Sequence, residues 1–291
     1  MQPSNPLTDQ LANINPVFIV AVVAALTLVR AALAKIKDPW ARTISETCDT
    51  VNFVLILAFL LIRPFVAQAF FIPSESMEKT LLVKDRLIVD KLSYRFTEPK
   101  RGDVVVFEAP LQATDGQRNI DFIKRLVALP GDTVQVKEAK IIVDGEPVDA
   151  RALGAYDTHA YLRERMGLYP DTPIKLFPDY VLVDGKRTVT PVELSQALGH
   201  AGAKIQIVPG RLYLNGKAMT EPYTNEDPDY DFGDPSDPSK PLKLGENEMF
   251  MMGDNRNHSK DSHIWGPLER KQVVGHAVVL FWPPGRMGWI R

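Results

Sequence analysis

Two serines and a lysine are the residues of this chain whose types suggest catalysis. Ser74 and Ser76 stand in residues 72–77 (IPSESM), directly after an apolar stretch, and Lys124 follows further along the chain. A serine hydroxyl becomes a nucleophile when a base accepts its proton, and a neutral amine is such a base. These residues therefore predict a serine hydrolase in which lysine takes the role of histidine.

The surroundings of Lys124 are compatible with a neutral amine. Residues 122–127 (FIKRLV) are typical of a β-strand, whose period of two puts Lys124 on the face of Phe122 and Leu126, with Arg125 opposite. Burial without a counter-ion can lower a lysine pKa from about 10.4 to roughly 7, a shift of about 4 kcal/mol. The alternative is a lysine that covers apolar surface with its stem and keeps its charge in water.

A third polar cluster, residues 253–266, is dense in Gly, Asn, Asp and Ser. Such a composition predicts a tight turn held by side-chain hydrogen bonds. Within it, Ser259 can accept a hydrogen bond from a neutral Lys124 amine. A carboxylate in direct contact would raise the lysine pKa and make the amine a poorer base.

A histidine-based alternative stays open. His258 or His263 could act as the base for Ser76, with Asp261 orienting the imidazole. The two histidines lie in an irregular loop without a metal-ligand pattern, so the sequence predicts no metal site there.

Alternating acidic residues mark a second segment. Asp227, Asp229 and Asp231 invite comparison with a calcium loop, but the positions that should hold Gly and Glu are Phe232 and Pro238. The many prolines nearby favour an acidic, solvated, partly mobile loop that contributes no site.

Apolar residues are concentrated near the N-terminus. Residues 17–29 and 51–62 predict two transmembrane helices, although neither run reaches about 20 residues unaided. No basic residue precedes Arg30, whereas the connection between the two runs contains Lys35, Lys37 and Arg42. The positive-inside rule then places this connection in the cytoplasm and everything after the second run on the other side.

The overall composition adds two constraints. The chain has 291 residues and a net charge of −2 without a basic stripe, which argues against nucleic-acid binding. Its single cysteine, Cys48, leaves the exported part without a disulfide, so the stability of that part must come from its core.

The exported part is predicted to be mainly β. Short runs rich in branched residues, separated by turn residues, predict antiparallel sheets or a partly closed barrel. The runs are 86–91, 103–107, 122–127 and 273–282. Asp-Gly or Asn-Gly pairs at 144–145, 184–185 and 215–216 predict three hairpins.

Two helices are expected in the region after these first strands. A capping box at Thr190 and Glu193 begins one helix and Gly199 ends it, and residues 156–167 predict another. We therefore divide the chain into a membrane anchor (1–62), a catalytic β domain (63–139 with 246–291) and an inserted α+β second domain (140–245).

Four segments in order carry a resemblance to a known family. Residues 72–77, 101–107, 124–132 and 253–262 resemble the conserved boxes of bacterial type I signal peptidases, also called leader peptidases, which are membrane-bound Ser/Lys proteases. The similarity covers roughly residues 44–139 and 208–282. It implies a mostly antiparallel β catalytic domain, anchored in the membrane, that needs no metal or other cofactor.

The resemblance also implies a role for each matching residue. Ser76 corresponds to the nucleophile, Lys124 to the general base, and Ser74 to the serine that completes the oxyanion hole with the Ser76 amide. Ser259 corresponds to the serine that positions the lysine, and Asp261 to a structural carboxylate. His263 stands where the family often has arginine, which leaves the partner of that carboxylate open.

The implied partners and location follow from the same resemblance. Substrates would be preproteins whose signal peptides carry small residues before the cut and add alongside a strand near residues 70–72. Other partners would be the phospholipid bilayer and the protein-export machinery, with no nucleic acid. The protein would be a multi-pass protein of the cytoplasmic membrane, with its catalytic domain on the periplasmic or extracytoplasmic side.

Two alternative functions remain at this point. One is a dedicated Ser/Lys protease for a single secretion, conjugation or pilus substrate. The other is a membrane-anchored domain that binds partners without catalysis.

Overall fold

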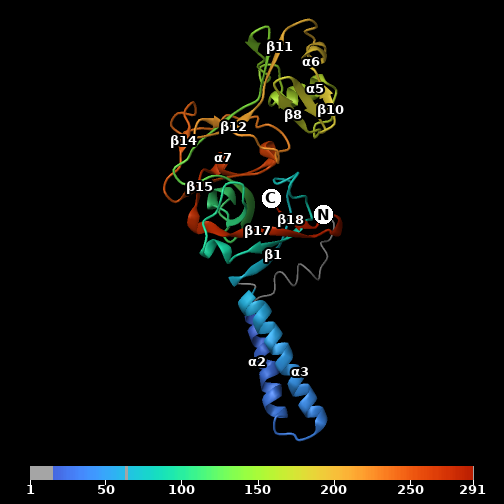
Figure 1. Ribbon diagram of the computed structural model, residues 1–291, viewed down its shortest axis with the longest axis vertical. Helices are drawn as coiled ribbons and strands as arrows, with labels where there is room; N and C mark the ends of the chain where they lie inside the picture. The colour runs from blue at the N-terminus through green and yellow to red at the C-terminus, as the bar shows by residue number, and fades with distance from the viewer. Residues whose placement is uncertain (1–15, 63–64, 291) are drawn as a thin grey trace. The chain divides into compact units, whose positions relative to one another are not determined.

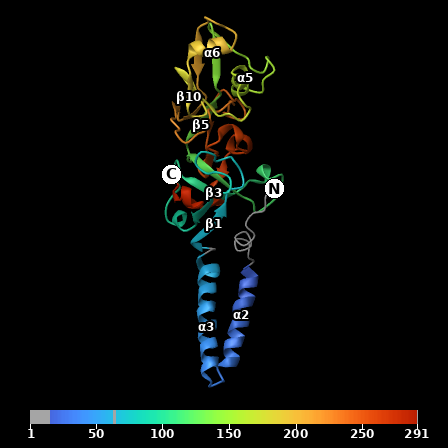
Figure 2. The same cartoon turned by 90° about the vertical axis from the view of Figure 1, so that its right-hand side faces the viewer.

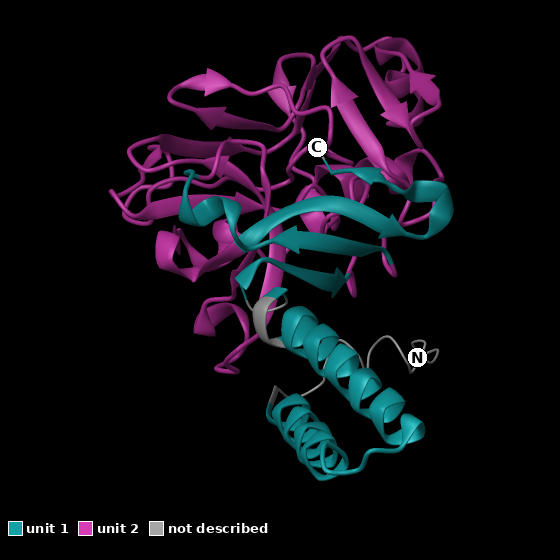
Figure 3. Cartoon of the chain, turned by 60° about the horizontal axis from the view of Figure 1, so that its bottom comes forward, with its two compact units in different colours: residues 1–71, 85–98, 275–290 teal, residues 72–84, 99–274, 291 magenta. Residues whose placement is uncertain are grey.

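The computed structural model describes residues 16–62 and 65–290, which form two compact units. The first unit comprises residues 1–71, 85–98 and 275–290, and the second comprises 72–84, 99–274 and 291 (Figure 3). The division into an anchor, a catalytic domain and an inserted domain stays a prediction. Residues 1–15, 63–64 and 291, the first of which include most of the N-terminal segment of the predicted anchor, lie outside the described residues.

A helical hairpin occupies the two apolar runs of the first unit. Helix α2 (Pro16–Leu33) and α3 (Pro39–Leu55) lie side by side, and α3 continues as the π-helix η1 (Ile56–Ile62) (Figures 1 and 2). Between α2 and α3, Asn52 Nδ2 donates to Thr27 Oγ1 at 3.1 Å and Arg30 pairs with Asp49. Within the described ranges, we find no helix that combines the length and apolarity required to cross a membrane.

The first unit also contains an antiparallel strand group. Strand β1 (Ala67–Phe71) pairs with β2 (Arg86–Asp90), which pairs on its other edge with β17 (Val273–Trp282), and β18 (Gly288–Trp289) pairs with β17. Among the described strands, β1 pairs with β2 alone. Its second edge is therefore available to an added strand.

A second antiparallel group, in the second unit, positions the polar clusters of the sequence. Its order is β3 (Val104–Glu108), β4 (Asp121–Ala128), β15 (Glu248–Met252) and β16 (Leu268–Glu269). The end of β15 leads directly into the Gly-, Asn- and Asp-rich turn, and β4 contains Lys124. The antiparallel pairing of β4 with β15 brings these distant segments together.

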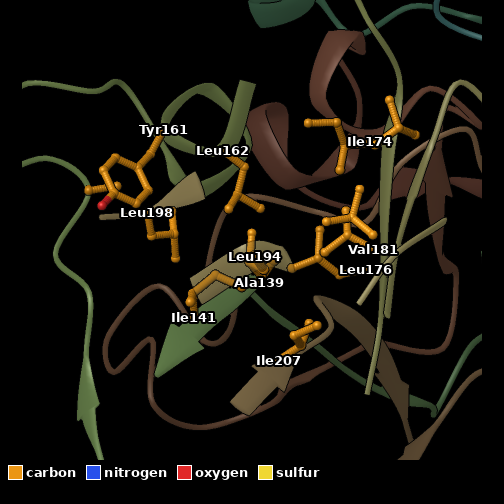
Figure 4. Close-up of a cluster of buried hydrophobic side chains, with 13 residues drawn as sticks. Ala139, Ile141, Tyr161, Leu162, Ile174, Leu176, Val181, Leu194, Leu198 and Ile207 are labelled. Carbon is orange, nitrogen blue, oxygen red and sulfur yellow. The ribbon is translucent and has the colours of Figure 1, made fainter. Parts of the chain in front are cut away.

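The rest of the second unit consists of three small antiparallel sheets and two helices. The sheets have the orders β13-β12-β5-β14, β11-β6-β7 and β10-β9-β8. Apolar residues from strands and helices form one buried cluster here, including Leu162, Ile174 and Leu194 (Figure 4). The elements are β5 (Thr133–Lys137), β6 (Lys140–Val143), β7 (Glu146–Pro147), α5 (Thr158–Arg165), β8 (Ile174–Phe177), β9 (Tyr180–Val183), β10 (Arg187–Val189), α6 (Pro191–Ala197), β11 (Ile205–Val208), β12 (Arg211–Leu214), β13 (Lys217–Ala218) and β14 (Leu242–Lys243).

Short helical turns complete the chain in both units. They are η2 (Ser93–Arg95), η3 (Leu111–Ala113), η4 (Arg256–His258), α7 (Ser262–Trp265), η5 (Arg270–Gln272) and η6 (Pro284–Arg286).

The structure confirms the local predictions of hairpins and helices. At the turn between β6 and β7, Asp144 and Gly145 have φ values of 51° and 93°, the positive values that a two-residue hairpin turn requires. Asn215 and Gly216 form the same two-residue turn between β12 and β13, whereas the loop between β9 and β10 has three residues, because Val183 pairs with Arg187; Asp184 and Gly185 in it also have positive φ. Helix α6 begins with the predicted capping box of Thr190 and Glu193. The prediction of a mainly antiparallel β protein is thus confirmed.

Candidate active site

The serine and lysine identified in the sequence are in contact. Lys124 Nζ lies 2.6 Å from Ser76 Oγ and donates a second hydrogen bond to the Ile123 carbonyl at 3.1 Å. Ser74 Oγ lies 3.4 Å from Ser76 Oγ. Lys124 is only 5% exposed and Ser76 only 7%, so the pair is largely shielded from water.

Burial changes the acidity of this lysine. Removal from water lowers the pKa of Lys124 from 10.5 to about 8, although the charges of Asp261 and Asp254 oppose this shift. Among the described residues, no carboxylate lies within ion-pair distance of the amine. A substantial fraction of Lys124 is therefore neutral near pH 8, and its closest neighbour is a hydroxyl group.

A close backbone contact holds the Ser76 segment in place. Asn255 N donates to the Ser76 carbonyl at 3.2 Å. A Cβ atom at Gly253 would lie 2.4 Å from that carbonyl oxygen and 2.2 Å from Ser259 Oγ. Such distances are well below contact distance, so only glycine allows this approach. The turn after β15 thereby fixes the backbone of the serine.

A buried ion pair supports the same turn and was not anticipated from the sequence. Arg125 donates to both carboxylate oxygens of Asp254, at 2.8 and 2.7 Å, and Thr80 Oγ1 donates to the same carboxylate. The guanidinium also lies 4.1 Å from the centroid of the Tyr223 ring. An arginine within an apolar strand and an aspartate next to a glycine were the available signals, but only the tertiary structure pairs them.

Asp261 receives the partner that the sequence left open. His263 Nδ1 lies 2.7 Å from Asp261 Oδ1, and Gly253 N donates to Oδ2 at 2.8 Å. Burial alone would raise the pKa of Asp261, but the hydrogen bond and charge of His263, with the Gly253 amide, lower it. The His263 ring stacks on Tyr230 with centroids 4.0 Å apart.

In the part of the chain that the structure describes, Ser76 is hydrogen-bonded to the lysine and not to a histidine. Within the described residues, neither His258 nor His263 is hydrogen-bonded to Ser76, whereas Lys124 is. Ser259 is buried, its hydroxyl contributes to the lowered pKa of Asp261, and no hydrogen bond joins it to Lys124 within the described residues. Its role in positioning the lysine thus stays a prediction.

The expectation of a solvated acidic loop is wrong for Asp227 and Asp229, which are buried, whereas Asp231 is exposed as expected. Glu226, Asp227 and Asp229 are each less than 9% exposed. Their carboxylates are buried because each finds donors: Asp229 binds His159 Nδ1, Asp227 accepts from a strand amide, and Glu226 pairs with Arg163. The alternating aspartates and the prolines suggested an exposed loop. The groups that donate hydrogen bonds to these carboxylates lie far away in the sequence, so the sequence did not reveal them.

One group in this region has the spacing of metal ligands. Donor atoms of Asp157, His159 and Asp229 lie within 4.8 Å of one another. However, Asp157 already accepts from Ala160 N at 2.7 Å as the N-cap of α5, and Asp229 is hydrogen-bonded to His159. The group is thus explained by its internal hydrogen bonds.

Comparison with known proteins agrees with the geometry. Residues 44–191 and 196–282 match the family described as "Signal peptidase, peptidase S26". The chain belongs to this signal peptidase family. The match includes every residue of the cluster around Ser76 and Lys124.

Relatives from several organisms extend this result over most of the chain. A signal peptidase I of Leptolyngbya laminosa is 33% identical over 84% of this chain and 82% of its own length. A signal peptidase I of Aquifex aeolicus is 34% identical over 79% and 81%. A probable signal peptidase I-2 of Synechocystis is 32% identical over 90% and 84%.

Proposed function

We propose that this peptidase removes N-terminal signal peptides from exported preproteins, with Ser76 as nucleophile and Lys124 as general base. The observation that carries the proposal is the 2.6 Å contact between Lys124 Nζ and Ser76 Oγ in a site where burial lowers the lysine pKa to about 8. Membership of the signal peptidase family supports the reaction and the class of substrate. No alternative base lies within hydrogen-bond distance of Ser76 among the described residues.

The reaction proceeds in two steps. Neutral Lys124 accepts the Ser76 proton while Oγ attacks the scissile carbonyl carbon, and the resulting ammonium group protonates the leaving amine. The Ser74 hydroxyl and the Ser76 amide donate hydrogen bonds to the oxyanion. Water then attacks the acyl-enzyme, with Lys124 again accepting a proton, and the signal peptide leaves with a new carboxylate.

Two further residues support this machinery without reacting. Asp261 holds the Gly253 amide and His263, and it thereby fixes the turn that packs on the Ser76 carbonyl. Its negative charge also raises the pKa of Lys124, against the larger lowering that burial causes. Ser259 lies against Gly253 and is available as a neutral acceptor when the amine moves during the reaction.

Substrate alignment uses the unpaired edge of β1. An extended substrate segment would pair with this edge by backbone hydrogen bonds, and β1 ends at Phe71, only a few residues before Ser74 and Ser76 in the sequence. Small residues are required one and three positions before the cut, as in the family that the sequence resembles.

We further propose that the helical hairpin anchors the enzyme in the cytoplasmic membrane, with the catalytic residues on the periplasmic or extracytoplasmic side. Large apolar side chains on both helices are exposed, including Val17, Leu28 and Phe53. The bilayer and the export machinery would be its partners there. Basic residues in the connection between the runs support a cytoplasmic location for the turn of the hairpin.

A thiol-labelling experiment tests this topology. In a Cys48→Ser background, Lys37→Cys should react with a membrane-impermeant reagent only after spheroplasts are permeabilised. Tyr169→Cys, at an exposed position of the second unit, should react in intact spheroplasts. Reaction of Lys37→Cys from outside would reverse the orientation.

A purified assay tests the function itself. The detergent-solubilised enzyme should cut a model preprotein after its signal peptide, and mass spectrometry of both products should locate the bond. Ser76→Ala should form neither product. A panel of several preproteins tests breadth, because cleavage of a single member would instead indicate a dedicated processing protease.

A further inference from the structure

A pocket of about 260 Å³ borders the Ser76 segment within the second unit. Its lining includes Glu75, Glu78, Arg163, Asp171, Glu226 and Asn255. Small-molecule sites usually have volumes of about 300–1,000 Å³. This pocket is therefore better suited to one side chain of a larger ligand than to a separate metabolite.

Two residues that line the pocket, Glu75 and Asn255, are direct neighbours of the proposed nucleophile. Glu75 directly precedes Ser76 in the chain, and Asn255 N donates to the Ser76 carbonyl at 3.2 Å. The Asn255 side chain donates from Nδ2 to the Glu75 carbonyl at 3.3 Å and to Glu78 Oε2 at 3.5 Å. Anything bound in the pocket thus contacts the residues on either side of the Ser76 backbone, Glu75 in the chain and Asn255 through its hydrogen bond.

The lining carries an excess of negative charge. It includes four carboxylates and one guanidinium, and Arg163 is already paired with Glu226. The other three carboxylates, those of Glu75, Glu78 and Asp171, form no ion pair with any residue in the described ranges. Such a concentration of one charge attracts a ligand of the opposite charge.

An unsatisfied acceptor points to the same kind of ligand. Asn255 is 3% exposed, and its Oδ1 has no hydrogen-bond partner among the described residues. A buried acceptor without a donor is unfavourable, and a ligand with N–H groups offers the missing donor. An ammonium or guanidinium group supplies both the N–H donors and the positive charge.

We propose that this pocket binds a lysine or arginine side chain of the preprotein, located in the mature segment shortly after the cleaved bond. The mature side follows because the positions one and three residues before the cut require small side chains and the signal peptide before them is apolar. The inference rests on the proposed function and adds a substrate preference to it. It makes Glu75, Glu78 and Asp171 specificity-determining residues.

The test compares preproteins that differ at one position. The mature segment is made neutral, and Lys, Gln or Glu is then placed singly at each of the first five positions after the cut. The purified full-length enzyme is assayed at low salt for kcat/KM. At one position or two neighbouring positions, we expect Lys to exceed Gln by about three- to tenfold, since each exposed charge contributes modestly. The preference should weaken as salt is added.

Variants of the enzyme assign the preference to the pocket. Glu78→Gln with Asp171→Asn, which preserves side-chain shape, should bring the Lys-to-Gln ratio close to one. Glu146→Gln is the matched control, because Glu146 is an exposed carboxylate outside the pocket and forms no ion pair among the described residues. It should keep the ratio of the parent enzyme.

The outcomes separate the two proposals. Equal rates for Lys, Gln and Glu at every position, with cleavage intact, would overturn the pocket assignment and leave the proposed function standing. A preference that survives in the double variant, or that appears only before the cut, would also overturn it. Failure to cut any preprotein would instead contradict the proposed function.

Discussion

Lys124 and His159 are both basic side chains buried in the second unit, yet their pKa values shift in opposite directions. Burial lowers the pKa of Lys124 to about 8, against the weaker opposing charges of Asp261 and Asp254. Burial also disfavours the charged form of His159, but the charge and hydrogen bond of Asp229 outweigh it and raise the His159 pKa. The difference lies in the direct neighbour, which is a hydroxyl for the lysine and a carboxylate for the histidine.

The comparison shows how one chain separates reactivity from stability. A buried amine without a counter-ion accepts a proton readily when it is neutral. The lowering of the Lys124 pKa from 10.5 to about 8 corresponds to a free energy of about 3 kcal/mol. A buried imidazole next to a carboxylate has a raised pKa, which favours its charged form, and it joins α5 to the acidic segment.

Replacing the lysine should remove activity and increase stability. Lys124→Met should reduce cleavage by more than about 10³-fold, because no other base contacts Ser76. The folded protein should become more stable at pH 7, by up to about 3 kcal/mol. Because the folded pKa is lowered, this gain should be complete below about pH 8 and should fade as pH rises toward 10.5.

Cleavage assays and denaturant unfolding across this pH range provide the measurements. His258→Ala is the control and should retain most activity, as should His263→Ala. A histidine variant as inactive as Lys124→Met, while still folded, would contradict the Ser/Lys assignment.

Breaking the pair of His159 and Asp229 should have the opposite effect and lower the stability of the protein. Asp229→Asn leaves a buried imidazolium without its carboxylate and should lower the free energy of unfolding by about 3–5 kcal/mol. The measurement is urea unfolding at pH 7, above the pKa of about 6 to which burial raises Asp229, so that the carboxylate of the parent protein is ionised. The control Asp179→Asn, at an exposed turn, should change the free energy of unfolding little. Equal stability of the two variants would show that the pair is not charged in the folded state.

The oxyanion donor should matter for rate more than for binding. Ser74→Ala should lower kcat by about 10²–10³-fold with little change in KM, because the hydroxyl acts on charge that develops in the transition state. Ser74→Thr keeps the hydroxyl and should recover part of the loss. If Ser74→Ala is as fast as the parent enzyme, the oxyanion hole has been assigned to the wrong residue.

The smallest effect concerns the pH profile. For the parent enzyme, kcat/KM should rise with pH through about 8, because only the neutral amine accepts the Ser76 proton. The charge of Asp261 raises the lysine pKa, so Asp261→Asn should move this rise to lower pH by a fraction of a pH unit, whatever its effect on the maximum rate. A move to higher pH would show that the carboxylate does not act through its charge.

Local features were predictable because their causes are local. The three hairpin turns depend on two adjacent residues that tolerate positive φ, and α6 depends on a capping box within four residues. The site residues came from motif resemblance; the structure places the side chains of Ser74, Ser76 and Lys124 next to one another, and their catalytic roles stay a prediction. The alternation of β4 correctly placed Lys124 near Phe122, whose ring centroid lies 5.5 Å from Nζ.

The sequence by itself determined the elements, the mainly antiparallel β class and the residue types available for catalysis, because these depend on periodicity and on neighbours along the chain. Only the tertiary structure decided that Arg125 pairs with Asp254, that His263 holds Asp261 and that Asp227 and Asp229 are buried. It also decided the pKa values. The charge of a side chain in a protein depends on the water it loses and the partners it gains, and both come from residues far away in the sequence.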